Sequence, residues 1–233
     1  MRNLSEKIWG RGEASQIMKD ARERFHWSSR EDLSDAYVAL ASVHYSLVKR
    51  YISSSRQKPL ALWHMWCAAR NARKACVTTS IKGFSPEQFD VLARIRAKAP
   101  SWLGGNPFHA MSMLNTALFH VNWRADEMKP HTRALMLITL GELEFLAGNR
   151  ISALNHHAEA RKLIPAIETE DSDDRDRQLV RVMTSVGFFY YDHAGQSERY
   201  WSEQLLRRAI ELAHTVSRDQ ELKILAEWRK RGR

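Results

Sequence analysis

Residues 140–165 read LGELEFLAGNRISALNHHAEARKLIP, and this stretch decides the fold. Gly141 stands in one helical segment, and Ala153 and Ala160 stand in the next. Because none of the three carries a large side chain, two helix backbones can approach closely at Gly141 and Ala153, and Ala160 leaves similar room for a further helix. The stretch therefore predicts two helices that pack against each other.

The residues between and after these helices predict where each helix ends. Gly148 can adopt the left-handed conformation that ends the first helix, and Asn149 can cap the second. Pro165 is expected to push Ile164 away from helical angles and so to stop the second helix. The expected unit is a helix, a tight turn and a second helix closed by a proline.

Helical periodicity extends over almost the whole chain, with no convincing run of strand alternation. Several prolines fall near a predicted helix start, where proline is favoured: Pro59, Pro86, Pro107 and Pro130. The expected helices, after a weaker segment near 13–26, are 33–54, 59–78, 86–98, 107–121, 130–147, 150–164, 177–193, 198–216 and 219–230. In the second of these, the stripe expected to face inward is Leu62, Trp66, Ala69 and Ala72.

The composition is that of an ordinary globular protein rich in helix. Of 233 residues, 44% are hydrophobic and 27% charged, and only ten glycines and six prolines interrupt the chain, which favours long helices. The sequence begins without the apolar stretch of a secretion signal, and no window is long and apolar enough to span a bilayer. Cys67 and Cys76 form no bridge framework and are interpreted as reduced thiols. We therefore expect a cytoplasmic protein without direct membrane insertion.

The positive charge is concentrated in the first half of the chain. Residues 1–100 hold 18 Lys+Arg against 9 Asp+Glu, whereas residues 101–233 hold 18 of each, so the formal net charge of +9 belongs to the first part. From Ala36 to Pro86 there is no acidic residue. A basic half beside a neutral half suggests that the first half binds an acidic surface.

The opening stretch resembles a tetratricopeptide repeat, a helix–turn–helix of about 34 residues. Leu140-Gly141 supply the Leu-Gly pair of that family, Ala153 and Ala160 its small residues, and Pro165 its closing proline. The sequence departs from the family pattern at three positions where tryptophan, tyrosine and phenylalanine are favoured, which here are Leu137, Glu144 and His157. The resemblance covers residues 134–165.

A second, weaker copy covers residues 180–213. Its first helix repeats the pattern with Met183, Val186, Gly187 and Tyr190, and its second helix with Leu206, Ala209 and Leu212. The turn between them is about three residues longer than in the family. Earlier helix pairs share only the layout.

The resemblance implies an all-α, right-handed α-solenoid of antiparallel helix pairs. We expect three regions: a basic N-terminal helical region at 1–98, a linker at 99–107, and repeats with a C-terminal capping helix at 108–233. A capping helix would cover the last apolar face of such a stack.

The sequence holds no convincing catalytic or metal site. His156 and His157 are adjacent, so they point about 100° apart on a helix and cannot share a metal ion. His157 is expected to pack between helices. His64 and Cys67 are metal-compatible at i,i+3, but two ligands do not make a site. The acidic loop at 168–176 lacks the glycine and the glutamate of a calcium loop. We therefore expect neither an enzyme nor a cofactor.

The favoured function is that of a non-enzymatic adaptor that holds a protein or peptide in a concave groove. By resemblance, the first helix of each pair lines this groove, and such an apolar-aromatic groove suits a peptide or an amphipathic helix. Burial of Phe145 and Phe188 in the core is an equally open alternative. The expected groove residues are Leu135, Ile138, Glu142 and Phe145 from one pair, and Arg181, Thr184, Phe188 and Tyr191 from the next.

The alternative function is nucleic-acid binding through the basic half. Trp63 could stack on an unpaired base while nearby cations contact phosphates. The expected basic patch is Arg56, Lys58, Arg70, Arg73 and Lys74. A solvated basic face with no ligand explains the same residues. A third possibility is a subunit of a larger assembly, in which exposed tryptophans are buried only in the complex.

Overall fold

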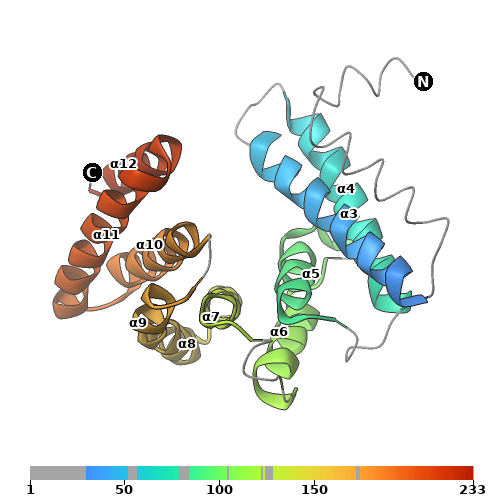
Figure 1. Ribbon diagram of the computed structural model, residues 1–233, viewed down its shortest axis with the longest axis horizontal. Coiled ribbons are helices and arrows are strands. Elements are labelled where there is room, and N and C mark those ends of the chain that lie inside the picture. Colours follow the sequence, from blue (N-terminus) through green and yellow to red (C-terminus); the bar gives the residue numbers. More distant parts are fainter. Residues whose placement is uncertain are drawn as a thin grey trace. The chain divides into compact units, whose positions relative to one another are not determined.

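The protein is all-helical wherever its structure is described, and no strand occurs in those residues. The computed structural model describes residues 30–51, 57–78, 84–103, 105–121, 123, 128–171 and 174–232. The segment expected near 13–26 lies outside them. The helices are α3 (Arg30–Tyr51), α4 (Lys58–Thr78), α5 (Pro86–Lys98), η3 (Ser101–Leu103), α6 (Pro107–Asn115), η4 (Thr116–His120), α7 (Pro130–Leu146), α8 (Arg150–Lys162), α9 (Ile164–Glu168), α10 (Arg175–His193), α11 (Gln196–Val216) and α12 (Arg218–Arg231) (Figure 1).

The chain divides into two compact units, residues 1–113 and 114–233, and the boundary in the sequence falls within α6. In the N-terminal unit α3 packs along α4, and α5 packs on both. In the C-terminal unit α7 packs on α8, α10 on α11, and α12 on α11, and α10 also contacts α7, α8 and α9. Neighbouring helix pairs therefore make up both units.

Proline begins several helices where the sequence predicts, and a side-chain cap that was not predicted precedes one of them. Pro86 lies in the first turn of α5, where its missing N–H costs no hydrogen bond. Before it, the Ser85 hydroxyl accepts from the Gln88 backbone N–H, and the Gln88 side chain accepts from the Ser85 N–H at 2.8 Å. This reciprocal pair is a capping box. Pro130 likewise lies in the first turn of α7, although no side chain caps that helix.

The α3–α4 interface is built from alanines, which corrects the predicted inner stripe of α4. Ala69 and Ala72 are buried as predicted, whereas Leu62 and Trp66, which were also expected to face inward, have exposed fractions of 52% and 41%. Ala68 and Ala75 are instead fully buried, so the backbones of α3 and α4 approach closely. The helix is turned toward its small residues because a stripe of alanines leaves room for the partner backbone, whereas Trp66 does not.

A buried histidine pair also lies between α3 and α4. The Nδ1 atoms of His44 and His64 are 2.9 Å apart, and both residues are almost fully buried. Burial, together with the neighbouring His64, lowers the pKa of His44 to about 4, and burial also lowers the pKa of His64. The two rings are therefore neutral at neutral pH and share a single hydrogen bond.

In the C-terminal unit, Gly141 brings α7 against α8. A methyl group on Gly141 would lie 2.6 Å from Cε1 of His157, closer still to its Nδ1, and 3.2 Å from the carbonyl oxygen of Ala153. His157 is fully buried and its ring stacks on Phe189, with the ring centroids 3.5 Å apart. The predicted packing role of Gly141, Ala153 and His157 is thus confirmed.

The turn after α7 is a Schellman motif. Gly148 has φ +90°, as predicted, and its N–H donates to the carbonyl of Phe145, while the Asn149 N–H donates to the carbonyl of Glu144. Asn149 does not cap α8, however. Its side-chain amide donates to Oε2 of Glu144 at 2.6 Å, because the Schellman turn places it over the end of α7.

Pro165 does not stop the helical run as expected. The helix α8 ends at Lys162, and the short helix α9 begins at Ile164 with Pro165 in its first turn. Ile164 and Ile167 of α9 are buried. Proline is tolerated here because the N–H groups of a first turn have no partner within the helix.

The pair α10–α11 repeats the glycine contact of α7–α8. A methyl group on Gly187 would lie 2.8 Å from Cγ of Leu206 and 3.6 Å from the carbonyl oxygen of Ser202. Ser202 and Leu206 therefore occupy the places that Ala153 and His157 take in the first pair. This correspondence agrees with the longer turn expected in the second copy.

Candidate partner-binding pocket

An open pocket of about 460 Å³ lies between the N-terminal halves of α10 and α12. Spacing of three and four residues places its α10 residues on one face of that helix and its α12 residues on one face of the other. The pocket is lined by Asp174, Arg177, Gln178, Val180, Arg181, Thr184 and Ser185 from the α10 segment, and by Gln220, Lys223 and Ile224 from α12.

Two of the sequence-predicted groove residues, Arg181 and Thr184, line this pocket. The α12 side of the pocket was not expected. Helical spacing does place Gln220, Lys223 and Ile224 on one face, but the sequence does not show which helix that face meets. The site therefore combines predicted residues of α10 with a second wall from α12.

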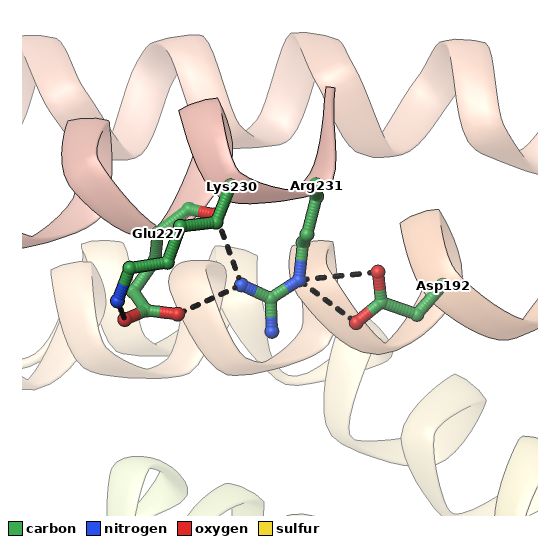
Figure 2. A network of polar contacts seen from close by, with 4 residues as sticks. All are labelled: Asp192, Glu227, Lys230 and Arg231. Atoms are coloured by element: carbon green, nitrogen blue, oxygen red, sulfur yellow. Dashed lines mark hydrogen bonds and ion pairs between the residues drawn. The ribbon is translucent and has the colours of Figure 1, made fainter. Parts of the chain in front are cut away.

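Ion pairs hold the C-terminal end of α12 on α10. Nε of Arg231 donates to both carboxylate oxygens of Asp192, at 2.9 and 3.1 Å, and Nη1 of Arg231 donates to Glu227 (Figure 2). Lys230 donates to the same Glu227 carboxylate at 2.8 Å. A guanidinium shared between two carboxylates sets the direction of the α12 end, because its donors form a rigid fork.

An apolar contact holds the middle of α12. Ile224 is buried with Val180 of α10 and Ala213 of α11, and Phe188 packs beside them. The guanidinium carbon of Arg231 lies 4.2 Å from the centre of the Phe188 ring. Phe188, predicted as a groove residue, is therefore half-buried under α12, and the open part of this face lies toward Arg181.

The remaining predicted groove residue of α10 contacts the helix that follows it. The ring of Tyr191 lies 4.2 Å from the guanidinium carbon of Arg199, on α11.

The predicted groove residues of α7 lie in different environments. Leu135 and Ile138 are buried, with exposed fractions of 5% and 3%, and Glu142 is exposed. Phe145 is half-buried, and its ring centroid is 4.1 Å from that of His193 on α10. The structure therefore places only Glu142 of this set in full contact with solvent.

The predicted basic patch is divided between two settings on α4. Lys58, Arg70 and Arg73 are exposed, and the guanidinium carbon of Arg70 lies 5.2 Å from the centre of the Trp66 ring. Lys74 is half-buried, with its ammonium 5.1 Å from the ring of Tyr37. Arg56 lies outside the described residues.

Two histidines of the C-terminal unit make polar contacts with neighbouring residues. Nδ1 of His131 lies 2.7 Å from Oε1 of Glu170 and joins α7 to the segment after α9. Burial lowers the pKa of His157 to about 4, although the hydrogen bond between its Nδ1 and the Ala153 carbonyl acts in the opposite direction. Over the described ranges, no cluster of three or more His, Cys, Asp or Glu side chains could hold a metal ion.

Among the described helices, none combines the length and the apolar character needed to cross a membrane.

Comparisons with protein-family models, with curated proteins and with solved structures find no match to this chain. Its helix pairs are compatible with a helical repeat, and the geometry of those pairs is the basis for a functional interpretation.

Proposed function

We propose that the protein is a non-enzymatic, cytoplasmic adaptor whose C-terminal unit is a right-handed solenoid resembling tetratricopeptide repeats. Its partner is a segment of another protein. The proposed binding surface is the side of the C-terminal unit formed by α7, α10 and α12, and it includes the pocket between α10 and α12.

The contacts within α10–α11 support an antiparallel pair. Gly187 meets Leu206 near the middle of both helices. Tyr190, three residues further along α10, contacts Trp201, which lies five residues earlier on α11. Positions that advance along one helix while receding along the other are those of antiparallel neighbours, the arrangement of a repeat pair. Repetition of the glycine contact in α7–α8 supports growth by stacking.

The observation that carries the proposal is the pocket itself. It opens at Arg181 and Thr184, which the resemblance assigns to the concave side, and its lining combines apolar Val180 and Ile224 with polar and basic side chains. A concave apolar surface with a few polar groups is the usual form of a binding site. Peptides bind helical surfaces of this kind through side-chain anchors.

Site-specific photocrosslinking tests the proposal. A benzophenone amino acid placed at Thr184, within the pocket, is expected to capture a defined protein partner in cells. The same amino acid at Tyr200, which is 69% exposed on α11 and outside the pocket, provides the matched control. Filling the pocket with Ser185→Trp should abolish capture by a crosslinker at Arg177, which also lines the pocket. Equal capture from Thr184 and Tyr200 would contradict pocket binding.

A second candidate function is nucleic-acid binding by the N-terminal unit. Trp66 is 41% exposed and Trp63 is 42% exposed on the same helix as exposed Arg70 and Arg73. An aromatic surface with adjacent cations can stack on unpaired bases and contact their phosphates. The Arg70–Trp66 contact is the specific observation that favours this function.

Salt dependence tests the second candidate. Association with single-stranded RNA should weaken steeply as salt rises from about 50 to about 200 mM, because released counterions drive phosphate binding. Arg70→Glu with Arg73→Glu should abolish it, whereas Lys98→Glu, an exposed residue on α5, should have a small effect. Absence of measurable association at low salt would end this candidate.

A further inference from the structure

Three polar atoms around the α10–α12 pocket lack a hydrogen-bond partner. Oε1 of Gln178, Oγ1 of Thr184 and Oε1 of Gln220 are screened from solvent and make no hydrogen bond with any described residue. Leaving a buried polar atom unsatisfied costs about 1–3 kcal/mol. A small turn of these side chains toward the pocket would let a ligand or an ordered water supply the missing partner.

The same pocket carries two positive charges that form no ion pair with an acidic side chain of the described residues. Nη1 of Arg177 lies 3.3 Å from Oδ1 of Asp174, so these two charges largely cancel. Arg181 and Lys223 line the pocket and form no ion pair in the described part of the chain. The pocket therefore has a surplus of two positive charges, one on each of its walls.

This surplus matches a phosphomonoester better than a carboxylate. A phosphomonoester carries about −1.5 to −2 charges at neutral pH and has three acceptor oxygens. The Arg181 guanidinium can donate two parallel hydrogen bonds, and Lys223 adds a compact charge. Once its side chain turns toward the pocket, the Thr184 hydroxyl can donate to a third oxygen. A carboxylate would neutralise only one of the two charges.

The two glutamines of the pocket, Gln178 and Gln220, can bind the peptide backbone next to a phosphorylated residue. A glutamine amide presents either its oxygen or its NH2 group, depending on how its last bond is turned. Gln178 and Gln220 can therefore bind both the N–H and the C=O of a peptide backbone. The pocket volume of about 460 Å³ is larger than a single phosphate group, which leaves room for the adjoining residues.

We propose that the pocket binds a phosphomonoester on a serine or threonine of the partner protein, held by Arg181 on α10 and Lys223 on α12. The proposal rests on the adaptor function for the protein source of the phosphate. The choice of a phosphate rests on the pocket residues alone. Because α12 is fixed on α10 by Arg231 and Ile224, the two cations are held on packed helices rather than on loops.

Binding of labelled peptide libraries to the full chain tests this proposal. The probes are a degenerate phosphoserine library, the same library without phosphate, and free inorganic phosphate and adenosine monophosphate as competitors. The phosphorylated library is expected to bind at least about tenfold more tightly than the unmodified one, through charge-assisted hydrogen bonds. The free phosphates are expected to compete only at far higher concentration.

Substitutions of the two pocket cations are compared with the same substitution of a lysine outside the pocket. Lys223→Gln and Arg181→Gln should each weaken phosphopeptide binding about tenfold, since each removes a charged donor. Lys230→Gln makes the same charge change on α12 but outside the pocket, where the ammonium is paired with Glu227, and binding should be unchanged. Melting curves of all three variants verify that they are folded.

Three results would overturn the proposal. They are equal binding of both libraries, equal losses from Lys223→Gln and Lys230→Gln, or binding of free adenosine monophosphate as tight as that of the phosphopeptides. The two proposals fail separately. A partner captured from Thr184 with no preference for phosphate refutes only the phosphate site, whereas phosphate binding with no captured partner refutes the adaptor.

Discussion

The helix pairs α7–α8 and α10–α11 are built on the same close contact but set different side chains against it. In the first pair Gly141 faces His157, whose ring is held by the stack on Phe189 and the hydrogen bond to Ala153. In the second pair Gly187 faces the aliphatic side chain of Leu206. Both pairs need a glycine, but only the first opposes it with a planar ring fixed on several sides. The pairs should therefore differ in their tolerance of added volume and of acid.

The largest difference is expected on adding one methyl group to each glycine. Gly141→Ala should lower the free energy of unfolding by about 3 kcal/mol, the upper part of the usual range for overpacking, because the fixed ring of His157 cannot move aside. Gly187→Ala should cost about 1 kcal/mol or less, since Leu206 can change rotamer and alanine favours the helix by roughly 1 kcal/mol. Urea unfolding of both variants measures the difference.

A double substitution provides the control. Trimming the opposing ring with His157→Ala should make the further change Gly141→Ala nearly neutral, because contacting residues couple strongly. Equal destabilisation by Gly141→Ala and Gly187→Ala would contradict the difference between the two pairs.

Acid is expected to separate the pairs by a smaller amount. Burial lowers the pKa of His157 to about 4, below its ordinary value in the unfolded chain, so the unfolded state binds more protons. This contribution to stability is complete above the ordinary histidine pKa of about 6.5 and is lost as the pH falls toward 4. Between about pH 7 and pH 5 the loss is about 2 kcal/mol.

The substitution His157→Leu places in α7–α8 the type of side chain that faces the glycine in α10–α11. It should remove the loss of stability between about pH 7 and pH 5. Hydrogen exchange measured by mass spectrometry on α8 peptides compares the variant with the parent at both pH values. The α3–α4 peptides serve as an internal reference. They should stay acid-sensitive in both proteins, because the pKa of His44 is also lowered to about 4. Unchanged acid sensitivity of α8 in His157→Leu would show that another group titrates there.

The glycine contacts could be predicted from the sequence because their causes are local. A glycine within a helical pattern, followed after a turn by small or apolar residues at i and i+4, indicates a close helix crossing. Gly148 was equally predictable, because a left-handed helix end favours glycine. Proline positions located the starts of α5 and α7 for the same reason.

The features that the sequence did not predict depend on which helix faces pack against each other in the folded protein. Trp66 and Ala68 both fit an inner stripe by spacing, and only the fit of α4 against α3 selects the alanines. The pocket needs α12 to lie beside α10 with Lys223 toward Arg181, which no pattern within either helix specifies. Pro165 was misread because one residue type both ends a helix and begins the next one.

The smallest expected effect on stability comes from the contacts that cover one aromatic ring of α7 and one of α10. Phe145 of α7 is covered by His193 of α10, and Phe188 of α10 by Arg231 of α12. Arg231→Ala should cost about 1 kcal/mol, as expected for a partly exposed ion pair with a cation–π contact. The loss should appear as faster hydrogen exchange in α12, with little change in α8.

Lys230→Ala is the control for that loss, because Lys230 pairs with the same Glu227 carboxylate but touches neither Asp192 nor Phe188 in any described contact. Its effect on α12 exchange should be negligible, since exposed ion pairs contribute little. If the two substitutions speed hydrogen exchange in α12 equally, α12 is held by a general effect of positive charge and not by the specific contacts of Arg231. If only Arg231→Ala does so, the ion pair of Arg231 with Asp192 holds α12, and with it the second wall of the pocket, in place. The same variant should then also weaken phosphopeptide binding without removing either pocket cation.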